Sequence, residues 1–189
     1  MTTSYPLVTT TKGSHTSFLV TAIIMYHVYL GLGTNLGRRE ENLINAIAGV
    51  GDVVNVTAVS PIYETEAWGL TDQPDFLNNC LAGQTTLAPL ELLDFVKKLE
   101  VHLGRAPAER WGPRLIDIDI LLYEELIVRS ARLDVPHMGM ADRATVLVPL
   151  ADIAPDLVHP LSGKTVTELL SAVDTTGVRP YRAPDHLNN

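Results

Sequence analysis

The feature that most constrains the fold of this chain is the short segment at residues 115–123, which reads LIDIDILLY. Side chains two apart along a β-strand point to the same face, so Asp117 and Asp119 share one face, with Cα atoms roughly 6 to 7 Å apart. The isoleucines before, between and after them fill the opposite face. The segment therefore predicts a strand with a hydrophobic core on one side and two carboxylates on the other.

Two neighbouring carboxylates beside a hydrophobic sheet are unfavourable unless water or a cation compensates their charge. Magnesium prefers a couple of carboxylates completed by waters and phosphate oxygens, which is what Asp117 and Asp119 offer. The alternative is an outer strand face on which both carboxylates are only solvated, because a short D-x-D motif often occurs without a metal.

The loop before this strand concentrates positive charge. Arg105, Arg110 and Arg114 lie close together in a chain whose formal net charge is -8. Guanidinium groups clamp phosphates through charged, forked hydrogen bonds. The glycines and prolines among them favour a lid that closes over a triphosphate, and Trp111 would be costly to expose on such a loop without a ligand to cover it. The alternative is that these arginines are only solvated.

Composition limits the class of protein and its location. With 189 residues, 46% of them hydrophobic, the chain fits one globular domain, expected at residues 25–189 after a flexible extension at residues 1–24. Met25 could be the natural start. The apolar run at residues 18–25 is too short to cross a bilayer, which takes about 20 residues. The single cysteine, Cys80, excludes an internal disulfide and is typical of a cytoplasmic protein.

Hydrophobic periodicity predicts an α+β fold, a ferredoxin-like sandwich in which helices pack on one face of an antiparallel sheet. A long loop is expected at residues 60–74 and a short strand-like run at residues 126–128, after a turn. Strands are expected at residues 27–32, 53–59, 75–85 and 115–123, and helices near residues 43–50, 90–99, 142–150 and 165–173.

Several common site motifs are missing from the sequence. There is no Gly-rich run ending in Gly-Lys-Ser/Thr, which excludes a P-loop kinase. Gly31 and Gly33, followed by Asn35, are too weak a signal for a dinucleotide-binding fingerprint. No His or Cys spacing indicates zinc, and no serine has the G-x-S-x-G setting of a hydrolase.

The stretch at residues 110–121, RWGPRLIDIDIL, resembles the defining motif of the 6-hydroxymethyl-7,8-dihydropterin pyrophosphokinases. Residues 29–37 (YLGLGTNLG), 72–79 (DQPDFLNN) and 135–137 (VPH) resemble three further blocks of that family. The resemblance implies that the pterin hydroxymethyl oxygen attacks the β-phosphorus of ATP and that AMP leaves. It also implies two Mg²⁺ ions, which bridge the triphosphate and the carboxylate pair.

The resemblance also implies roles for individual residues. Asp117 and Asp119 would bind both metal ions, and Arg105 and Arg114 would neutralise charge during the transfer. Residues expected along the nucleotide are Lys97, Glu100, Trp111, Ile120, Arg132, His137 and Arg143. Residues expected around the pterin are Thr65, Trp68, Phe76 and Asn78.

Two departures from the family pattern affect these expectations. Thr145 stands where relatives usually have a second aromatic that stacks on the pterin, so one wall of that site is missing or is supplied by Trp68. The arginine loop is a residue shorter than in some members and has no lysine between Arg105 and Glu109.

Two other classes of function share some of these sequence features. A nucleic-acid or regulatory module can share a ferredoxin-like fold, but the negative net charge and the paired aspartates argue against it. A metal-dependent phosphohydrolase could use the same carboxylates. We therefore expect an ATP-dependent transferase that acts on small molecules as a monomer, without nucleic-acid or membrane partners.

Overall fold

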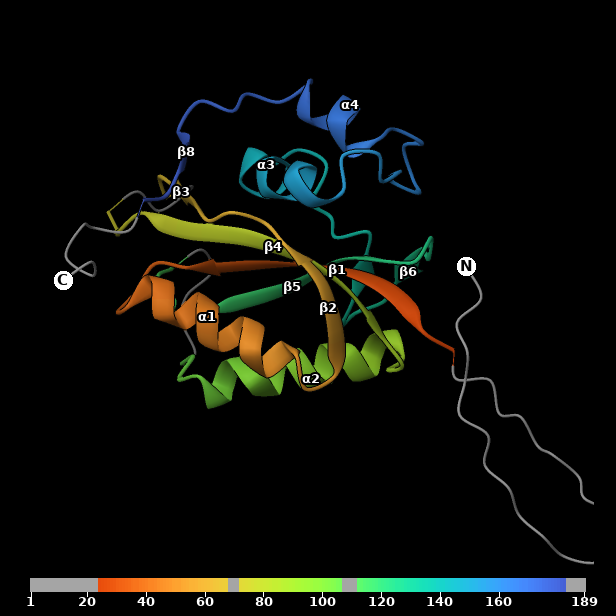
Figure 1. Cartoon of the computed structure of the whole chain (residues 1–189), viewed down its shortest axis with the longest axis horizontal. Coiled ribbons are helices and arrows are strands. Elements are labelled where there is room, and N and C mark those ends of the chain that lie inside the picture. The colour runs from red at the N-terminus through yellow and green to blue at the C-terminus, as the bar shows by residue number, and fades with distance from the viewer. Residues whose placement is uncertain (1–23, 68–71, 107–111, 183–189) are drawn as a thin grey trace, which may run out of the picture.

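The computed structural model describes residues 24–67, 72–106 and 112–182 (Figure 1). The expected flexible extension at residues 1–24 lies, apart from Ile24, outside the described residues. In the described part of the chain, no helix combines the length and the apolar character needed to cross a bilayer.

A six-stranded sheet forms the centre of the described structure, and all of its strand pairs are antiparallel. Its order is β5-β1-β4-β3-β8, and β2 also pairs with β4, beyond the end of β3. Its strands are β1 (Tyr26–Thr34), β2 (Val54–Val59), β3 (Tyr63–Thr65), β4 (Phe76–Thr85), β5 (Asp117–Tyr123) and β8 (Val178–Pro180). The strand that carries the two aspartates is therefore an edge strand beside β1.

Helices cover both faces of this sheet (Figure 1). On one face lie α1 (Arg39–Val50) and α2 (Pro89–His102), as expected for a ferredoxin-like sandwich. On the other lie α3 (Ala144–Ile153) and α4 (Val166–Leu170), so the prediction of helices on one face holds only for the first two. Helices lie on both faces because each face has its own hydrophobic cluster. Leu121 of β5 points away from the core isoleucines and is buried in the second cluster, with residues of α3 and α4.

The apolar side of β5 is the foundation of the site. Ile116, Ile118 and Ile120 are each no more than 3% exposed and pack with the apolar faces of α1 and α2. Burying a side chain of this size contributes about 1.5–3 kcal/mol. This packing fixes which face of β5 is turned toward the core, and the side chains of the two aspartates therefore point to the opposite face.

Four short strands were not predicted as the structure has them. The expected loop at residues 60–74 contains β3, and its partner β8 lies far along the chain, so no local pattern could reveal the pair. The run at residues 126–128 does not return along β5. Instead β6 (Val128–Arg129) pairs with β7 (Asp134–Val135) in a separate two-stranded ribbon.

Candidate active site

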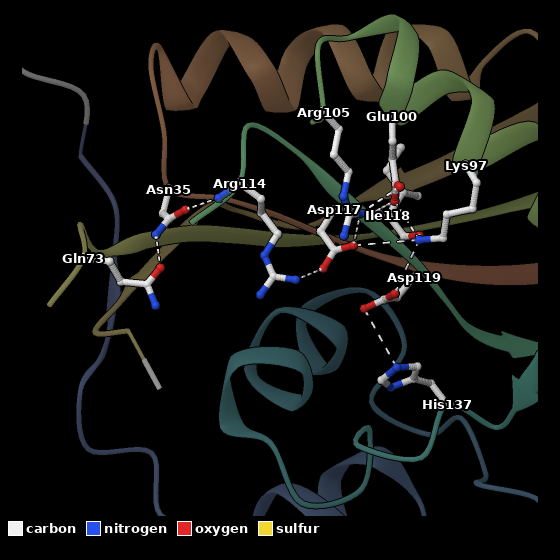
Figure 2. Close-up of polar contacts among 10 residues, drawn as sticks. All are labelled: Asn35, Gln73, Lys97, Glu100, Arg105, Arg114, Asp117, Ile118, Asp119 and His137. Carbon is white, nitrogen blue, oxygen red and sulfur yellow. Dashed lines mark hydrogen bonds and ion pairs between the residues drawn. The ribbon is translucent and has the colours of Figure 1, made fainter. Parts of the chain in front are cut away.

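The two aspartates of β5 lie close to one another around a single lysine (Figure 2). The Nζ atom of Lys97, on α2, lies 3.8 Å from Oδ1 of Asp117 and 3.9 Å from Oδ1 of Asp119. The strand alternation predicted from the sequence therefore brings both carboxylates within 4 Å of one ammonium nitrogen. This is the central requirement for a shared ion.

Asp117 is held by two arginines. Arg105 donates from Nη1 to Oδ1 of Asp117 at 2.5 Å, and Arg114 donates from Nη1 to Oδ2 at 2.6 Å. Burial alone would raise the pKa of Asp117, but Arg105, Lys97 and Arg114 together lower it below its ordinary value. Asp117 is therefore a carboxylate kept ionised by its surroundings.

Asp119 has weaker partners. In the described structure, Nζ of Lys97 and the ring Nε2 of His137 each lie 3.9 Å from a carboxylate oxygen of Asp119, and its side chain is 39% exposed. Burial raises the pKa of Asp119, the adjacent charge of Asp117 raises it further, and His137 and Lys97 act in the opposite direction. The site thus holds one carboxylate fully paired with arginine and one that is available to a further cation.

Glu100 pairs with two of the cations of the site, Lys97 and Arg105. This buried carboxylate accepts a hydrogen bond from Nζ of Lys97 and one from the backbone N–H of Ile118, each at 2.7 Å. Nη1 of Arg105 lies 2.7 Å from its other oxygen. Burial raises the pKa of Glu100, although these partners oppose the shift. Glu100 therefore ties α2 to β5 and holds Lys97 and Arg105 at the aspartates.

Three of the residues expected around the pterin, Thr65, Phe76 and Asn78, lie beside this cluster on β3 and β4. Asn78 donates from Nδ2 to Oγ1 of Thr65 at 2.8 Å. The guanidinium carbon of Arg114 lies 5.5 Å from the centre of the Phe76 ring, within the range of a cation–π contact. Arg114 thus contacts both the aspartate side and the aromatic side of the site.

Three residues that the sequence did not identify as functional shape this face. Gly33 lies between Asn78 and Asp117 in the register, and Gly31 lies opposite Asp119. A Cβ atom on Gly33 would lie 3.1 Å from Oδ1 of Asn78. From the sequence, these glycines indicate only a weak nucleotide-binding fingerprint. In the structure, their lack of side chains leaves the sheet surface beside Asn78 and the aspartates uncovered.

Asn35 is the third of these residues. It is 1% exposed, accepts from the backbone N–H of Arg114 at 2.8 Å, and donates from Nδ2 to Gln73 at 2.9 Å and to the carbonyl of Pro74 at 3.0 Å. It therefore joins the segment after the arginine loop to the segment before Phe76 (Figure 2). No local signal in the sequence marks this role, because the partners of Asn35 lie far along the chain.

Some expected site residues are not brought together with the cluster. Ile120 is 3% exposed in the core beneath the sheet, so its side chain faces away from the aspartates. Arg132 forms an ion pair with Asp94 of α2, and Arg143 packs over Gly139. Trp68 and Trp111, expected at the pterin and the nucleotide respectively, lie outside the described residues.

The donor set suits a magnesium ion. Within the described ranges, no three His, Cys, Asp or Glu side chains are grouped so as to hold a metal by themselves. Mg²⁺ commonly uses only one or two carboxylates, with waters and substrate phosphates as its other ligands, and Asp117 and Asp119 provide such a pair. Paired carboxylates beside two arginines and a lysine are the arrangement expected in the class of phosphoryl-transferring enzymes.

Comparison with known proteins identifies the family. The sequence model of the 7,8-dihydro-6-hydroxymethylpterin-pyrophosphokinases matches residues 29–155. The 2-amino-4-hydroxy-6-hydroxymethyldihydropteridine pyrophosphokinase of Methylorubrum extorquens is 46% identical over 156 residues, covering 82% of this chain and 98% of that protein. The enzyme of the same name from Aquifex aeolicus is 42% identical over 144 residues, covering 76% of this chain and 90% of that protein. The chain therefore belongs to the 7,8-dihydro-6-hydroxymethylpterin-pyrophosphokinase family.

Family membership confirms the activity expected from the sequence motif. The enzyme transfers a pyrophosphoryl group from ATP to 6-hydroxymethyl-dihydropterin, a step of folate biosynthesis.

Solved structures confirm the fold. Plasmodium falciparum HPPK-DHPS, crystallised as the wild type with pteroate, matches with a TM-score of 0.65 at 15% identity. The match covers 82% of this chain but only 43% of that one, so the chain spans less than half the length of the solved protein. At this identity the likeness supports the α+β, ferredoxin-like architecture and nothing further.

Proposed function

We propose that Asp117 and Asp119 hold two Mg²⁺ ions against the triphosphate of ATP, and that Arg105 and Arg114 assist the transfer to the pterin hydroxyl. The observation that carries this proposal is the common distance of both carboxylates from one ammonium nitrogen, 3.8 and 3.9 Å. Bound Mg²⁺ would withdraw negative charge from the phosphate oxygens and orient the β-phosphorus for attack.

The arginines have two sets of partners in this proposal. In the structure without ligand they neutralise both oxygens of Asp117. Phosphate oxygens are equally good partners for a guanidinium group, so an incoming triphosphate offers them an exchange of one anion for another. Arg105 and Arg114 can therefore exchange the carboxylate of Asp117 for the phosphate oxygens, and neutralise the charge on those oxygens as AMP leaves.

The pterin is proposed to bind beside the metal site, against Phe76, Asn78 and Thr65. Phe76 supplies a flat ring for stacking, and the amide of Asn78 can both donate to and accept from the edge of the heterocycle. Thr65 accepts the Nδ2 hydrogen bond that orients this amide. Trp68 is proposed as the second wall.

The remaining nucleotide contacts are proposed for residues on either side of Asp117 and Asp119. His137 adjoins Asp119, Lys97 adjoins both aspartates, and Glu100 holds Lys97 in place. Arg132 and Arg143, which are exposed, would turn from Asp94 and Gly139 to reach phosphates. Trp111 and the backbone of Ile120 complete the proposed nucleotide site. ATP and the pterin are the only partners that the proposal requires, for a monomer in the cytoplasm.

Incubation with ATP and Mg²⁺, with and without the hydroxymethyl-dihydropterin, tests the reaction. AMP should form only when the pterin is present. Release of phosphate without pterin would instead indicate a metal-dependent phosphohydrolase that uses the same carboxylates.

The residue assignment is tested by Asp117→Ala and Asp117→Asn, with Asp156→Ala as a control at an exposed position. Both variants at Asp117 should lose turnover, because the site loses one of its two carboxylates, whereas the control should keep it. Turnover by a folded Asp117 variant at the rate of the control would refute the metal role.

A further inference from the structure

Lys97 lies beside both carboxylates of the proposed metal site, a position that a contact to the nucleotide alone would not require. Among the described residues, it is the one cation whose nitrogen lies within 4 Å of both aspartates, with Nζ 3.8 Å from Asp117 and 3.9 Å from Asp119 (Figure 2). We infer that Lys97 is a resident counter-cation of the carboxylate pair, which holds Asp117 and Asp119 together in the absence of metal and weakens their affinity for Mg²⁺. This inference rests on the proposed metal site.

The position of the ammonium group is set independently of the aspartates. Its hydrogen-bond partners are Oε1 of Glu100, at 2.7 Å, and the backbone carbonyl of Ile118, at 3.0 Å. Glu100 is itself buried, with a side chain only 3% exposed. The lysine is therefore anchored on the helix and on the strand backbone, while its charge acts on both carboxylates through space.

The two carboxylates depend on this charge to different degrees. Asp117 has Arg105 and Arg114 as direct partners, at 2.5 and 2.6 Å. Asp119 has no guanidinium group within ion-pair distance in the described part of the chain. Nζ of Lys97 and Nε2 of His137 lie 3.9 Å away there, and the charge of Arg114 acts on Asp119 only from farther away. Lys97 is thus a principal compensation for the repulsion between the aspartates, and for the charge of Asp119 in particular.

The same charge opposes a divalent ion. A cation bound to both carboxylates would share their immediate surroundings with the ammonium group, and like charges at such distances repel. The Lys97 side chain is 42% exposed, so water weakens this repulsion without removing it. Removal of the lysine charge should therefore tighten metal binding by about tenfold, which corresponds to about 1.4 kcal/mol.

A lysine that only anchors α2, or only contacts the nucleotide, would behave differently. Replacement of a pure anchor would reduce stability with or without metal. Replacement of a pure nucleotide contact would leave binding of the metal alone unchanged. Only a counter-cation predicts tighter metal binding together with a loss of stability that metal restores.

The test compares Lys97→Gln with Lys98→Gln, which removes the same charge from the exposed neighbouring position. Glutamine keeps an N–H donor for the carbonyl of Ile118, and Lys97→Arg serves as the variant that keeps the charge. The dissociation constant of Mn²⁺ alone is measured by electron paramagnetic resonance, and melting temperatures are measured in a chelator and in excess Mg²⁺.

Lys97→Gln should bind Mn²⁺ about tenfold more tightly than the wild type, whereas Lys98→Gln and Lys97→Arg should match the wild type. Its melting temperature should fall in the chelator and recover in Mg²⁺ by more than that of Lys98→Gln. Equal or weaker Mn²⁺ binding by Lys97→Gln overturns the inference while leaving the proposed metal site intact. A wild-type protein that binds no Mn²⁺ contradicts that site, and the inference with it.

Discussion

Gly33 of β1 lies directly opposite Asp117 of β5 in the register of the sheet. The same glycine is paired on its other side with Asn78 of β4, so one residue without a side chain separates the proposed metal ligand from the proposed pterin ligand. A substrate whose hydroxyl group attacks a phosphate must lie close to both. The absence of a side chain at Gly33 therefore allows the proposed metal site and the proposed pterin site to lie next to each other.

Gly33→Ala should raise the KM for the pterin by about tenfold. The added Cβ would lie 3.1 Å from Oδ1 of Asn78 and would displace the amide. Overpacking of this kind typically costs about 1–3 kcal/mol. Steady-state kinetics with each substrate varied in turn should place the effect on the pterin, with little change in the KM for ATP.

Gly31→Ala is the matched control for this prediction. Its Cβ would contact the flexible end of Leu121, at 3.3 Å, and not Asn78. If both alanine variants raise the pterin KM equally, the effect is general crowding of the sheet, and the specific role of Gly33 is wrong.

Much of the sheet and the carboxylate pair could be predicted from the sequence, because both follow from local alternation. The period of two in β5 correctly directed Asp117 and Asp119 to one face and the isoleucines to the other. Helix α2 begins at Pro89, as the fixed φ of proline at a first turn leads one to expect. The chemistry of the motif was readable because its residues are neighbours in sequence.

Contacts between distant segments were not predictable in the same way. Asn35 bonds to residues about 40 and 80 positions away, and no local pattern distinguishes it from an asparagine in a turn. The strand β8 has only three residues, too few for a periodic signal, and its pairing with β3 depends on the tertiary fold. Ile120 was assigned to the nucleotide by resemblance, although its side chain lies in the core.

A network of charges joins the strand β8 to β3, which forms part of the proposed pterin site. Nη2 of Arg179 lies 2.6 Å from Asp75 and 3.2 Å from Glu64, and Nη1 of Arg39 lies 2.8 Å from Glu64. Glu64 precedes Thr65 in β3. The network therefore holds the strand that orients Asn78 through Thr65.

Arg179→Gln should raise the KM for the pterin by roughly threefold and leave the KM for ATP unchanged. The effect should be modest because exposed ion pairs are weak individually. Hydrogen exchange of the Tyr181 amide, which donates to the carbonyl of Ile62 at 2.8 Å, should become faster. Arg38→Gln is the control, since Arg38 is 82% exposed and pairs only with Glu41 among the described residues. Identical exchange and kinetics in the two variants would show that β8 does not position the site.

His159 should make the fold less stable in mild acid. It is 6% exposed, and burial lowers the pKa of His159, with Arg129 adding to the effect and Asp142 opposing it. The unfolded chain therefore takes up a proton as the pH falls through about 6.5, before the folded chain does. The stability that a neutral His159 contributes is complete above this pH and is lost below it, by at most about 1.4 kcal/mol per pH unit.

Urea unfolding at about pH 7.5 and about pH 5.5 measures this loss of stability. His159→Gln should lose less free energy of unfolding between the two conditions than the wild type. His102→Gln, at an exposed position, should show the wild-type dependence. A pH dependence that His159→Gln leaves unchanged would exclude His159 as its source.

Thr145 offers a test of how the pterin site is completed. It lies in the first turn of α3, and this end of the helix lies over β4, since Sγ of Cys80 contacts the carbonyl of Val146 at 3.6 Å. The sequence resemblance to the family implies a stacking aromatic at this position. Thr145→Phe should therefore lower the dissociation constant of the pterin by about two- to tenfold, because an aromatic pair contributes about 0.5–1.5 kcal/mol.

Fluorescence titration with the pterin measures this change, and Thr145→Leu separates stacking from added apolar surface. Leucine should give a smaller gain than phenylalanine, since it lacks the flat ring. Weaker pterin binding by the phenylalanine variant would indicate that the wall is already filled, as expected if Trp68 closes the site. Combining Thr145→Phe with Trp68→Ala then decides between the two: restored affinity in the double variant means that either aromatic can cover the same face of the ring.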